Sequence, residues 1–223
     1  MKEMLERLNV VYDSLELLSD DMWRVGGRGD ALLDAWFVLN THKTETHHSP
    51  LLIGSEQSLA LIWEFWAENA GTAVADIEER AEALDGRTFL QQRWDAEVTS
   101  LQQQQDPDEQ EALHALTQVN ASAMTYDPQA ANLDGFFAIW DTTTQNISEQ
   151  CFLLLIPTPD ETAAHAYLRY GGWNSYPRAE EHIAVLRYWR EKYGATLVSL
   201  TADTVELRLE QPIQDPHHRW PLR

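Results

Sequence analysis

Residues 171–177 read GGWNSYP and run directly into an amphipathic segment that ends at residue 193. The paired glycines predict a tight turn, and Pro177 favours a helix start because proline fits the first helical turn. The stripe that this helix is expected to bury consists of Ile183, Leu186, Trp189 and Tyr193. Gly194 then lies where a left-handed helix C-cap belongs. We expect this turn and helix to organise the fold.

Short apolar runs elsewhere in the chain predict strands. Residues 50–54 (PLLIG) are typical of a buried strand bounded by Pro and Gly, and Ser55 is placed to cap a following helix. Two hairpins are expected, one from residues 136–140 and 150–156 and one from residues 196–200 and 204–209. Residues 26–29 (GGRG) are expected to form a turn. The pattern predicts a mixed α/β fold, with a central mixed sheet of short strands and hairpins flanked by helices.

A single domain is expected for residues 1–223, because the length and the hydrophobic fraction of 43% suit one well-packed core. Residues 72–126 differ from the rest in being rich in Glu, Ala and Gln. Within them, Asp106, Pro107 and Glu109 form a capping pattern that starts a helix. We interpret residues 72–126 as an acidic helical insertion within the domain.

The charge of the chain restricts its partners. The formal net charge is −20, and residues 94–168 contain no Lys or Arg while holding twelve Asp and Glu. A field of this sign disfavours nucleic acid and anionic membranes, and it favours either solubility or a basic protein partner. The sequence has neither an apolar run of the roughly 20 residues that span a bilayer nor an N-terminal signal segment. We therefore expect a cytoplasmic protein with no contact to a membrane.

The sequence resembles a bacterial family catalogued as domain of unknown function 4253. In the C-terminal half, the segments that carry the resemblance are residues 156–159 (IPTP), 171–174 (GGWN), 181–189 (EHIAVLRYW), 193–195 (YGA) and 203–207 (DTVEL). Residues 31–36 (ALLDAW) and 50–54 (PLLIG) are similar to the N-terminal part of the family. The resemblance covers about residues 30–54 and 132–212. It implies a mixed α/β fold and implies no activity.

Metal binding is one hypothesis that the sequence raises. The residues that could ligate an ion are His42, Glu45, His47 and His48 in one loop, and His217 and His218 near the C-terminus. Adjacent histidines seldom bind one ion together, and no helix places two histidines four residues apart. A solvated polar loop is therefore the preferred interpretation, and we assign no metal site and no cofactor.

Catalysis is a second hypothesis. Cys151 lies within an apolar run and is expected to be a buried core thiol rather than a nucleophile. His165 and His182 could act with Glu181 or Glu206 as an acid–base group, although His182 is expected at the surface or at an interface. The glycine-rich residues 26–29 lack the lysine of a phosphate-binding loop. We assign no catalytic residue.

Trp173 and Asn174 leave two interpretations open. A tryptophan at a turn commonly fills the core, and an asparagine commonly bonds nearby backbone. Alternatively, Trp173 forms the aromatic wall of a pocket in which Asn174 reads a ligand, with His182 beside it. Trp63, Trp66 or Trp220, if exposed, would suit a protein-binding surface.

These observations favour a non-catalytic binding protein. An immunity-type protein that neutralises a basic toxin fits a long acidic segment, many aromatic residues and no assembled catalytic pattern. The acidic contacts are expected at Asp106, Asp108, Glu109 and Glu111. The alternative is a small-molecule enzyme or sensor with a pocket beside Trp173, Asn174 and His182. A third interpretation is a scaffold domain with no pocket and a self-associating face. A deep polar pocket at that turn favours the alternative, and a filled core there favours the binder.

Overall fold

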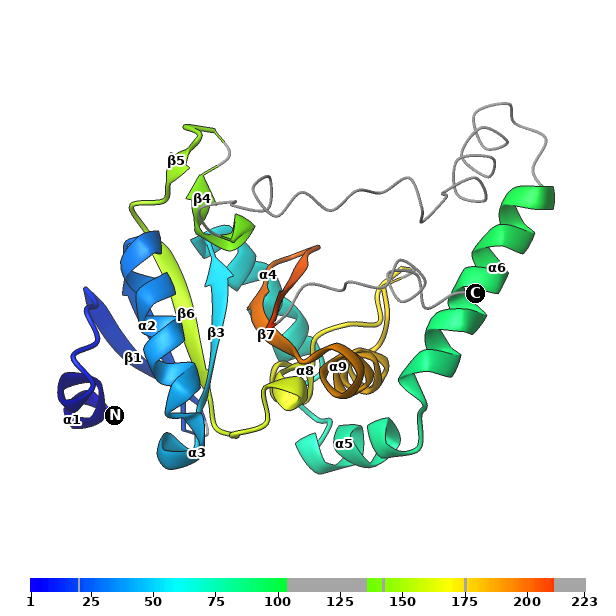
Figure 1. Cartoon of the computed structure of the whole chain (residues 1–223), viewed down its shortest axis with the longest axis horizontal. Coiled ribbons are helices and arrows are strands. Elements are labelled where there is room, and N and C mark those ends of the chain that lie inside the picture. The colour runs from blue at the N-terminus through cyan, green and yellow to red at the C-terminus, as the bar shows by residue number, and fades with distance from the viewer. Residues whose placement is uncertain (20, 104–135, 142, 175, 211–223) are drawn as a thin grey trace.

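The computed structural model describes residues 1–19, 21–103, 136–141, 143–174 and 176–210, which build a six-stranded mixed sheet with helices on both faces (Figure 1). In their order across the sheet, the strands are β1 (Ser14–Ser19), β2 (Met22–Gly27), β6 (Cys151–Ile156), β3 (Ser49–Gly54), β7 (Ala195–Leu200) and β8 (Val205–Leu209). Strands β3 and β7 are parallel, and every other neighbouring pair in the sheet is antiparallel. The mixed α/β fold expected from the sequence is confirmed.

The middle of the sheet is apolar on both faces. Strands β6 and β3 are buried at every residue, which is why consecutive large apolar residues, 152–156 in β6 and 51–53 in β3, replace the alternation of a strand with one exposed face. Side chains along β6 nonetheless alternate between two separate clusters. Phe152 and Leu154 belong to the cluster on one face, and Leu153 and Leu155 belong to the cluster on the other.

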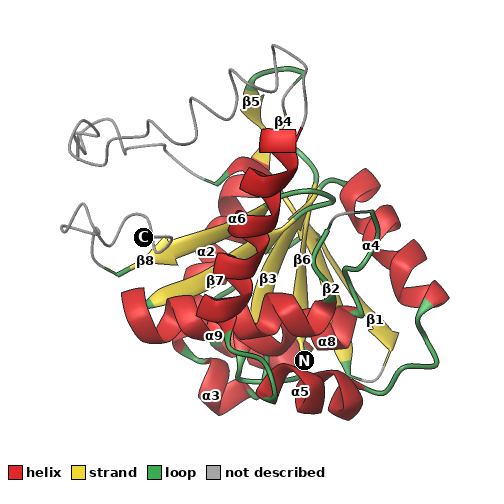
Figure 2. Cartoon of the chain, turned by 90° about the vertical axis from the view of Figure 1, so that its right-hand side faces the viewer, coloured by secondary structure: helices red, strands yellow, loops and turns green. Residues whose placement is uncertain are grey.

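Two groups of helices complete the layers. The first covers one face of the sheet and consists of α1 (Lys2–Arg7) and α2 (Gly29–Thr41), followed by the short α3 (Lys43–Thr46). The second covers the other face and consists of α4 (Glu56–Glu68), α8 (Ala164–Leu168) and α9 (Ala179–Tyr193), as Figure 2 shows from the side. None of the helices in the described residues is long and apolar enough to cross a membrane.

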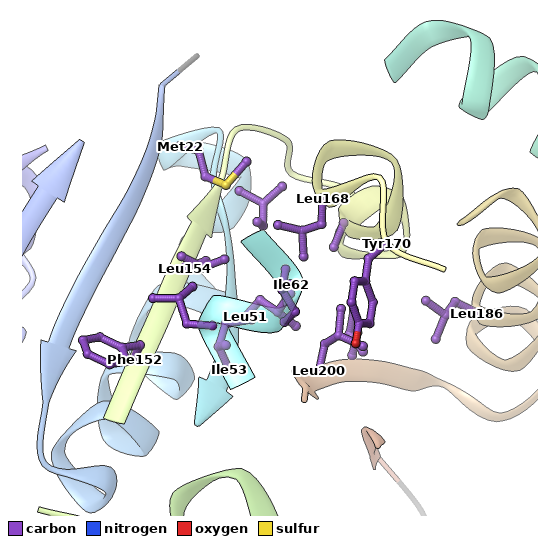
Figure 3. Packing of buried hydrophobic residues seen from close by; sticks show 14 residues of the cluster. Met22, Leu51, Ile53, Ile62, Phe152, Leu154, Leu168, Tyr170, Leu186 and Leu200 are labelled. Carbon is purple, nitrogen blue, oxygen red and sulfur yellow. The ribbon is translucent and has the colours of Figure 1, made fainter. Parts of the chain in front are cut away.

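The larger core cluster lies between the sheet and the second helix group (Figure 3). There Ile62 from α4, Leu168 from α8 and Leu186 from α9 converge on Leu51 and Leu154 of the sheet. Each of these side chains is at most 4% exposed. Burying one such side chain contributes about 1.5–3 kcal/mol, so this cluster supplies a large part of the stability.

The helices expected after residue 72 are present as α5 (Val74–Glu82) and α6 (Gly86–Gln103). Ile77 of α5 packs against Ile183 of α9, and both are buried. A Cβ atom on Gly86 would lie 2.2 Å from the carbonyl oxygen of Ala184, so the start of α6 approaches the α9 backbone closely. Both helices therefore pack on the domain core. The rest of the expected insertion, from residue 104 to 126, lies outside the described residues.

Two local predictions are wrong. Gly26 and Gly27 do not form a turn but end β2, where they pair with Phe152 and Cys151. A Cβ atom on Gly26 would lie 2.3 Å from Ser14 Oγ, so glycine here permits close contact between neighbouring strands rather than a reversal of the chain.

The hairpin expected from residues 136–140 and 150–156 is also absent. Residues Phe137–Ile139 form a single 3-10 turn, η2, and β4 (Trp140–Asp141) pairs only with β5 (Asn146–Ile147). Strand β6 instead inserts between β2 and β3, which are long enough to pair along its length. A short apolar run reveals burial, but it does not determine which strands will be its neighbours.

The C-terminal predictions are confirmed in part: Ile183 and Leu186 of the expected stripe are buried, whereas Trp189 and Tyr193 are half-buried, and α9 begins at Ala179, two residues after Pro177. Gly194 ends α9 in the left-handed conformation, with φ 62°, and β7 and β8 form the final hairpin. The Ser55 hydroxyl accepts a hydrogen bond of 3.3 Å from Ser58 N and so caps α4.

Candidate functional site

The turn at residues 171–177 links α8 to α9 through several left-handed residues. Gly171 has φ 133°, Gly172 has φ 92° and Asn174 has φ 50°. A backbone hydrogen bond of 3.0 Å from Gly172 N to Pro177 O closes the turn. A Cβ atom on Gly171 would lie only 2.4 Å from that same carbonyl oxygen. Only glycine fits position 171 without a shift of the backbone.

Trp173 is packed against other aromatic rings on one side of the turn. Its ring stacks on Phe65, with centroids 4.1 Å apart, and on Tyr176, with centroids 4.4 Å apart. Tyr170, whose ring is buried, lies 4.4 Å away. The aromatic side of the turn is therefore filled. Asn174 is exposed, and its side chain bonds none of the described residues, so its role in the turn is the left-handed conformation that asparagine tolerates.

The aromatic packing continues into a histidine pair. The Tyr176 ring lies 4.8 Å from His182, which stacks on His165 with centroids 4.3 Å apart. Tyr176 Oη, His182 Nε2 and both nitrogens of His165 are buried and have no hydrogen-bond partner among the described residues. His182 is half-buried, and its ring packs against His165 of α8.

Both imidazoles are held neutral. Burial lowers the pKa of His182 to about 4, against a small opposing effect of Glu181. Burial also lowers the pKa of His165 well below its usual value, and the neighbouring His182 lowers it further. Glu206 is far from this pair in the sheet, since it accepts hydrogen bonds from Phe137 N and Ala138 N. No carboxylate of the described residues therefore bonds either imidazole and orients it for acid–base chemistry, and Glu181 bonds the backbone N–H of Arg178 instead.

A cavity of about 380 Å³ opens on another side of the turn. Its wall is formed by Asn69, Thr72, Ile77, Arg80, Arg169, Gly171, Gly172, Arg178, Ala179 and Glu180. Glu180 is 6% exposed, and its Oε1 atom lies 3.4 Å from Arg80 Nε and 3.4 Å from Arg178 Nη1. Arg178 Nη2 also lies 3.0 Å from Glu181 Oε1. Two guanidinium groups thus meet at one buried carboxylate.

Arg169 lines the same cavity and is held differently. It ends α8 in the left-handed conformation, with φ 50°. Its Nε donates a 2.8 Å hydrogen bond to Thr72 O, and its guanidinium lies 5.3 Å from the centre of the Trp66 ring. It forms no ion pair with a carboxylate of the described residues. The cavity therefore contains one arginine whose charge is balanced only by backbone carbonyl groups and an aromatic ring.

A second cavity, of about 400 Å³, lies at the carboxyl ends of the parallel strands β3 and β7. Gly54 ends β3 and Ser55 follows it, and Thr201 and Asp203 follow β7. Ligands of open α/β sheets commonly bind at this edge. The lining contains hydroxyl groups and two carboxylates but no basic residue, so its charge disfavours an anion. The sequence signal for it was the Gly-Ser pair after a buried strand, which was interpreted only as a helix cap.

The remaining candidate residues have local roles or lie outside the described residues. His48 Nδ1 contacts Thr46 O at 2.8 Å, His42 Nδ1 contacts Val38 O at 2.8 Å, and Glu45 pairs with Arg7 at 2.6 Å. Cys151 is 1% exposed, and burial raises the pKa of its thiol, as expected for a core cysteine. The residues that lie outside the described part are Asp106, Asp108, Glu109, Glu111, His217, His218 and Trp220.

Comparison with known proteins identifies one family. No curated protein and no solved structure matches the chain. A family model with the description "Domain of unknown function (DUF4253)" matches residues 152–222. The matched range includes α8, the turn at residues 171–177, α9 and the final hairpin. It does not include residues 30–54, the other segment expected to resemble the family. Residues 152–222 of this chain are therefore a DUF4253-like domain.

Proposed function

We propose that the chain is a non-catalytic protein-binding domain that takes a basic protein as its partner, and that it acts as an immunity-type protein that neutralises a basic toxin. The observation that carries the proposal is the outer surface of α4. A cytoplasmic location is part of the proposal, because a toxin with an intracellular target is neutralised there.

The surface of α4 combines negative charge with aromatic rings. Leu59 and Ile62 face the core, while Glu56, Glu64 and Glu68 are exposed, and the helix contains no Lys or Arg. The helix also contributes Trp63 and Trp66, which are half-buried and stack with centroids 5.0 Å apart. Tryptophan is among the residues that contribute most to binding energy at protein interfaces.

Helix α5 extends the negative charge. Its exposed carboxylates are Asp76, Glu79 and Glu82, and its one basic residue, Arg80, contacts Glu180. None of the six exposed carboxylates of α4 and α5 forms an ion pair with another described residue. Pairing them with lysines or arginines of a partner would therefore break no ion pair within this part of the chain.

The expected contact with a basic partner combines electrostatic attraction over distance with tryptophan contacts in the interface. A net charge of −20 accelerates the approach of a basic protein, and the effect weakens as salt screens it. Trp66 already lies beside the Arg169 guanidinium, a cation–π contact of the kind that Trp63 can offer to a cation of the partner. Asp106, Asp108, Glu109 and Glu111 belong to the same proposal as further acidic contacts.

The test begins with affinity capture from the lysate of the source cell at low salt, followed by a high-salt wash. We expect one basic protein that is released at high salt. Expressed alone, that protein should inhibit growth, and co-expression of this chain should restore it. Association rates are then measured for the triple variant Glu56→Gln, Glu64→Gln and Glu68→Gln, and for a second variant neutralised at Asp106, Asp108, Glu109 and Glu111.

The matched control is the triple variant Glu3→Gln, Asp13→Asn and Asp34→Asn, which removes three exposed carboxylates away from α4 and α5. We expect the α4 variant to associate more slowly and with a weaker salt dependence than the control. Equal rates for these two variants would show that α4 is not the binding surface. A captured protein that is acidic or harmless would contradict the immunity role.

A further inference from the structure

We propose that the cavity beside Gly171 and Gly172 binds the phosphate or carboxylate group of a small anionic molecule, held by Arg169 together with Arg80 and Arg178. This inference does not rest on the protein-binding proposal, because it uses the opposite charge; the cavity adjoins α4 and α5, to which it is joined through Asn69, Arg80 and the contact of Arg169 with Trp66.

The first argument is the local charge. Among the ten residues that line the cavity there are three arginines and one carboxylate, Glu180. When Glu181 is added, because it also contacts Arg178, the group still has an excess of one positive charge. The chain as a whole carries −20. A positively charged cavity in so acidic a protein attracts a small anion that the rest of the surface repels.

The second argument is the way in which Arg169 is held. Its Nε–H is fixed by Thr72 O, and its Nη1 lies 3.4 Å from Tyr167 O, so the guanidinium is oriented without a carboxylate partner among the described residues. Nη2 has no hydrogen-bond acceptor there. An oriented guanidinium with free N–H groups matches the planar geometry of a carboxylate or the oxygens of a phosphate.

The third argument is the pair of arginines at Glu180. Arg80 and Arg178 approach the same oxygen atom, Oε1, at 3.4 Å each. Glu180 and Glu181 together offset the charges of Arg80 and Arg178, so the excess positive charge of the group is that of Arg169, and Glu180 is too buried to leave the site. Glu180 therefore positions both arginines at the wall of the cavity, and an anion from solution would complete the charge balance.

The fourth argument is the size and floor of the cavity. A volume of about 380 Å³ is within the range of small-molecule sites, which is roughly 300–1,000 Å³. Gly171 and Gly172 present only backbone atoms to it, so a ligand can approach the main chain closely. Helix α9 begins there, and the positive end of its dipole adds to the attraction that the arginines provide.

The test is calorimetric titration of the full chain with pyrophosphate, inorganic phosphate and citrate at constant ionic strength. We expect saturable binding of one ion per chain. Stronger binding of pyrophosphate identifies a phosphate site, and stronger binding of citrate identifies a carboxylate site. Arg169→Gln is expected to weaken the preferred ion by about tenfold or more, which corresponds to one charge-assisted contact. Arg169→Lys keeps the charge but loses the planar guanidinium group. Its affinity for the ion should lie between that of the parent and that of Arg169→Gln.

The matched control is Arg7→Gln, because Arg7 is an exposed arginine whose partner, Glu45, lies elsewhere on the surface. It removes the same charge and should leave the affinity unchanged. Each variant is compared with the parent in urea unfolding, so that loss of binding is separated from loss of fold. No saturable binding of any of the three ions up to about 10 mM, or equal affinities for Arg169→Gln and Arg7→Gln, would overturn the proposal. The triple α4 variant should bind the ion as the parent does.

Discussion

His165 and His182 stack almost in parallel, with ring centroids 4.3 Å apart and planes 13° from each other. One ring comes from α8 and the other from α9, so the pair joins the two helices that flank the turn at residues 171–177. Three of their ring nitrogens are buried without a hydrogen-bond partner among the described residues. The contact disfavours protonation of both rings, because two adjacent buried imidazolium groups would repel each other.

This arrangement predicts a loss of stability in mildly acidic solution. Burial lowers the pKa of His182 from 6.5 to about 4, so between these values the unfolded chain binds more protons than the folded chain. Above pH 6.5, His182 is neutral in both states and its protonation costs the folded chain nothing. As the pH falls from 6.5 toward 4, His182 lowers the free energy of unfolding by about 3 kcal/mol at most. His165 acts in the same direction. Urea unfolding measured from about pH 7 to about pH 4.5 should show this fall.

The variant His182→Phe keeps an aromatic ring on Tyr176 and His165 but cannot take up a proton. Its free energy of unfolding should depend less on pH over this range than that of the parent. The control is His47→Asn, which removes an exposed histidine from a left-handed position. The interpretation fails if both variants show the same pH dependence as the parent.

The histidine pair also illustrates what the sequence could and could not reveal. The period of α9 identified Ile183 and Leu186 as buried, and Gly194 identified the end of the helix, because both signals are local. The contact between His165 and His182 depends on how α8 docks on α9, which no local pattern encodes. The arginine cavity was missed for the same reason: Arg80, Arg169 and Arg178 come from three separate elements and are unremarkable individually.

The strand predictions differ in the same way. Residues 50–54 were identified correctly because an apolar run bounded by Pro and Gly is a strong local signal. The partner of β6 was predicted wrongly, because its true neighbours, β2 and β3, lie more than 90 residues away in the chain. Burial can be predicted from composition, but strand order is decided by the packing of the whole sheet.

A second prediction concerns Tyr170, whose ring lies at the centre of the larger core cluster. Its hydroxyl donates a 2.7 Å hydrogen bond to Ala202 O in the turn after β7, and burial raises the pKa of the phenol, which keeps it protonated as a donor. Tyr170→Phe keeps the packing and leaves this carbonyl unpaired, so it should lower the free energy of unfolding by about 1–2 kcal/mol. Tyr12→Phe, a half-buried tyrosine at the other face of the sheet, should change it little. Equal free energies of unfolding in urea for Tyr170→Phe and the parent would show that water replaces the hydroxyl without cost.

A third prediction concerns Glu206, which ties β8 to the η2 turn. Its carboxylate accepts hydrogen bonds from Phe137 N at 2.6 Å, Ala138 N at 3.0 Å and Ser199 Oγ at 2.5 Å. A glutamine at this position has one acceptor oxygen, so Glu206→Gln should destabilise the chain by about 1–2 kcal/mol. It should also speed amide exchange at Phe137 and Ala138, which line the cavity at the ends of β3 and β7. Glu210→Gln is the control. Unchanged amide exchange at Phe137 and Ala138 in Glu206→Gln would show that Glu206 does not hold the η2 turn against β8.

A final prediction concerns the glycine on which the turn depends. Gly171 has φ 133°, a conformation that side chains avoid, and an added Cβ atom would lie 2.4 Å from Pro177 O. Gly171→Ala should therefore lower the free energy of unfolding by more than about 2 kcal/mol, measured as a shift of the urea midpoint. Gly71→Ala is the matched control, because an added Cβ atom there meets nothing within 4 Å, and its effect should stay within about 0.5 kcal/mol. If the turn also shapes the arginine cavity, any Gly171→Ala chain that remains folded will bind the preferred oxyanion less tightly than Gly71→Ala. A folded Gly171→Ala variant with parental stability would mean that the backbone at this position moves freely, which its close contact with Pro177 argues against.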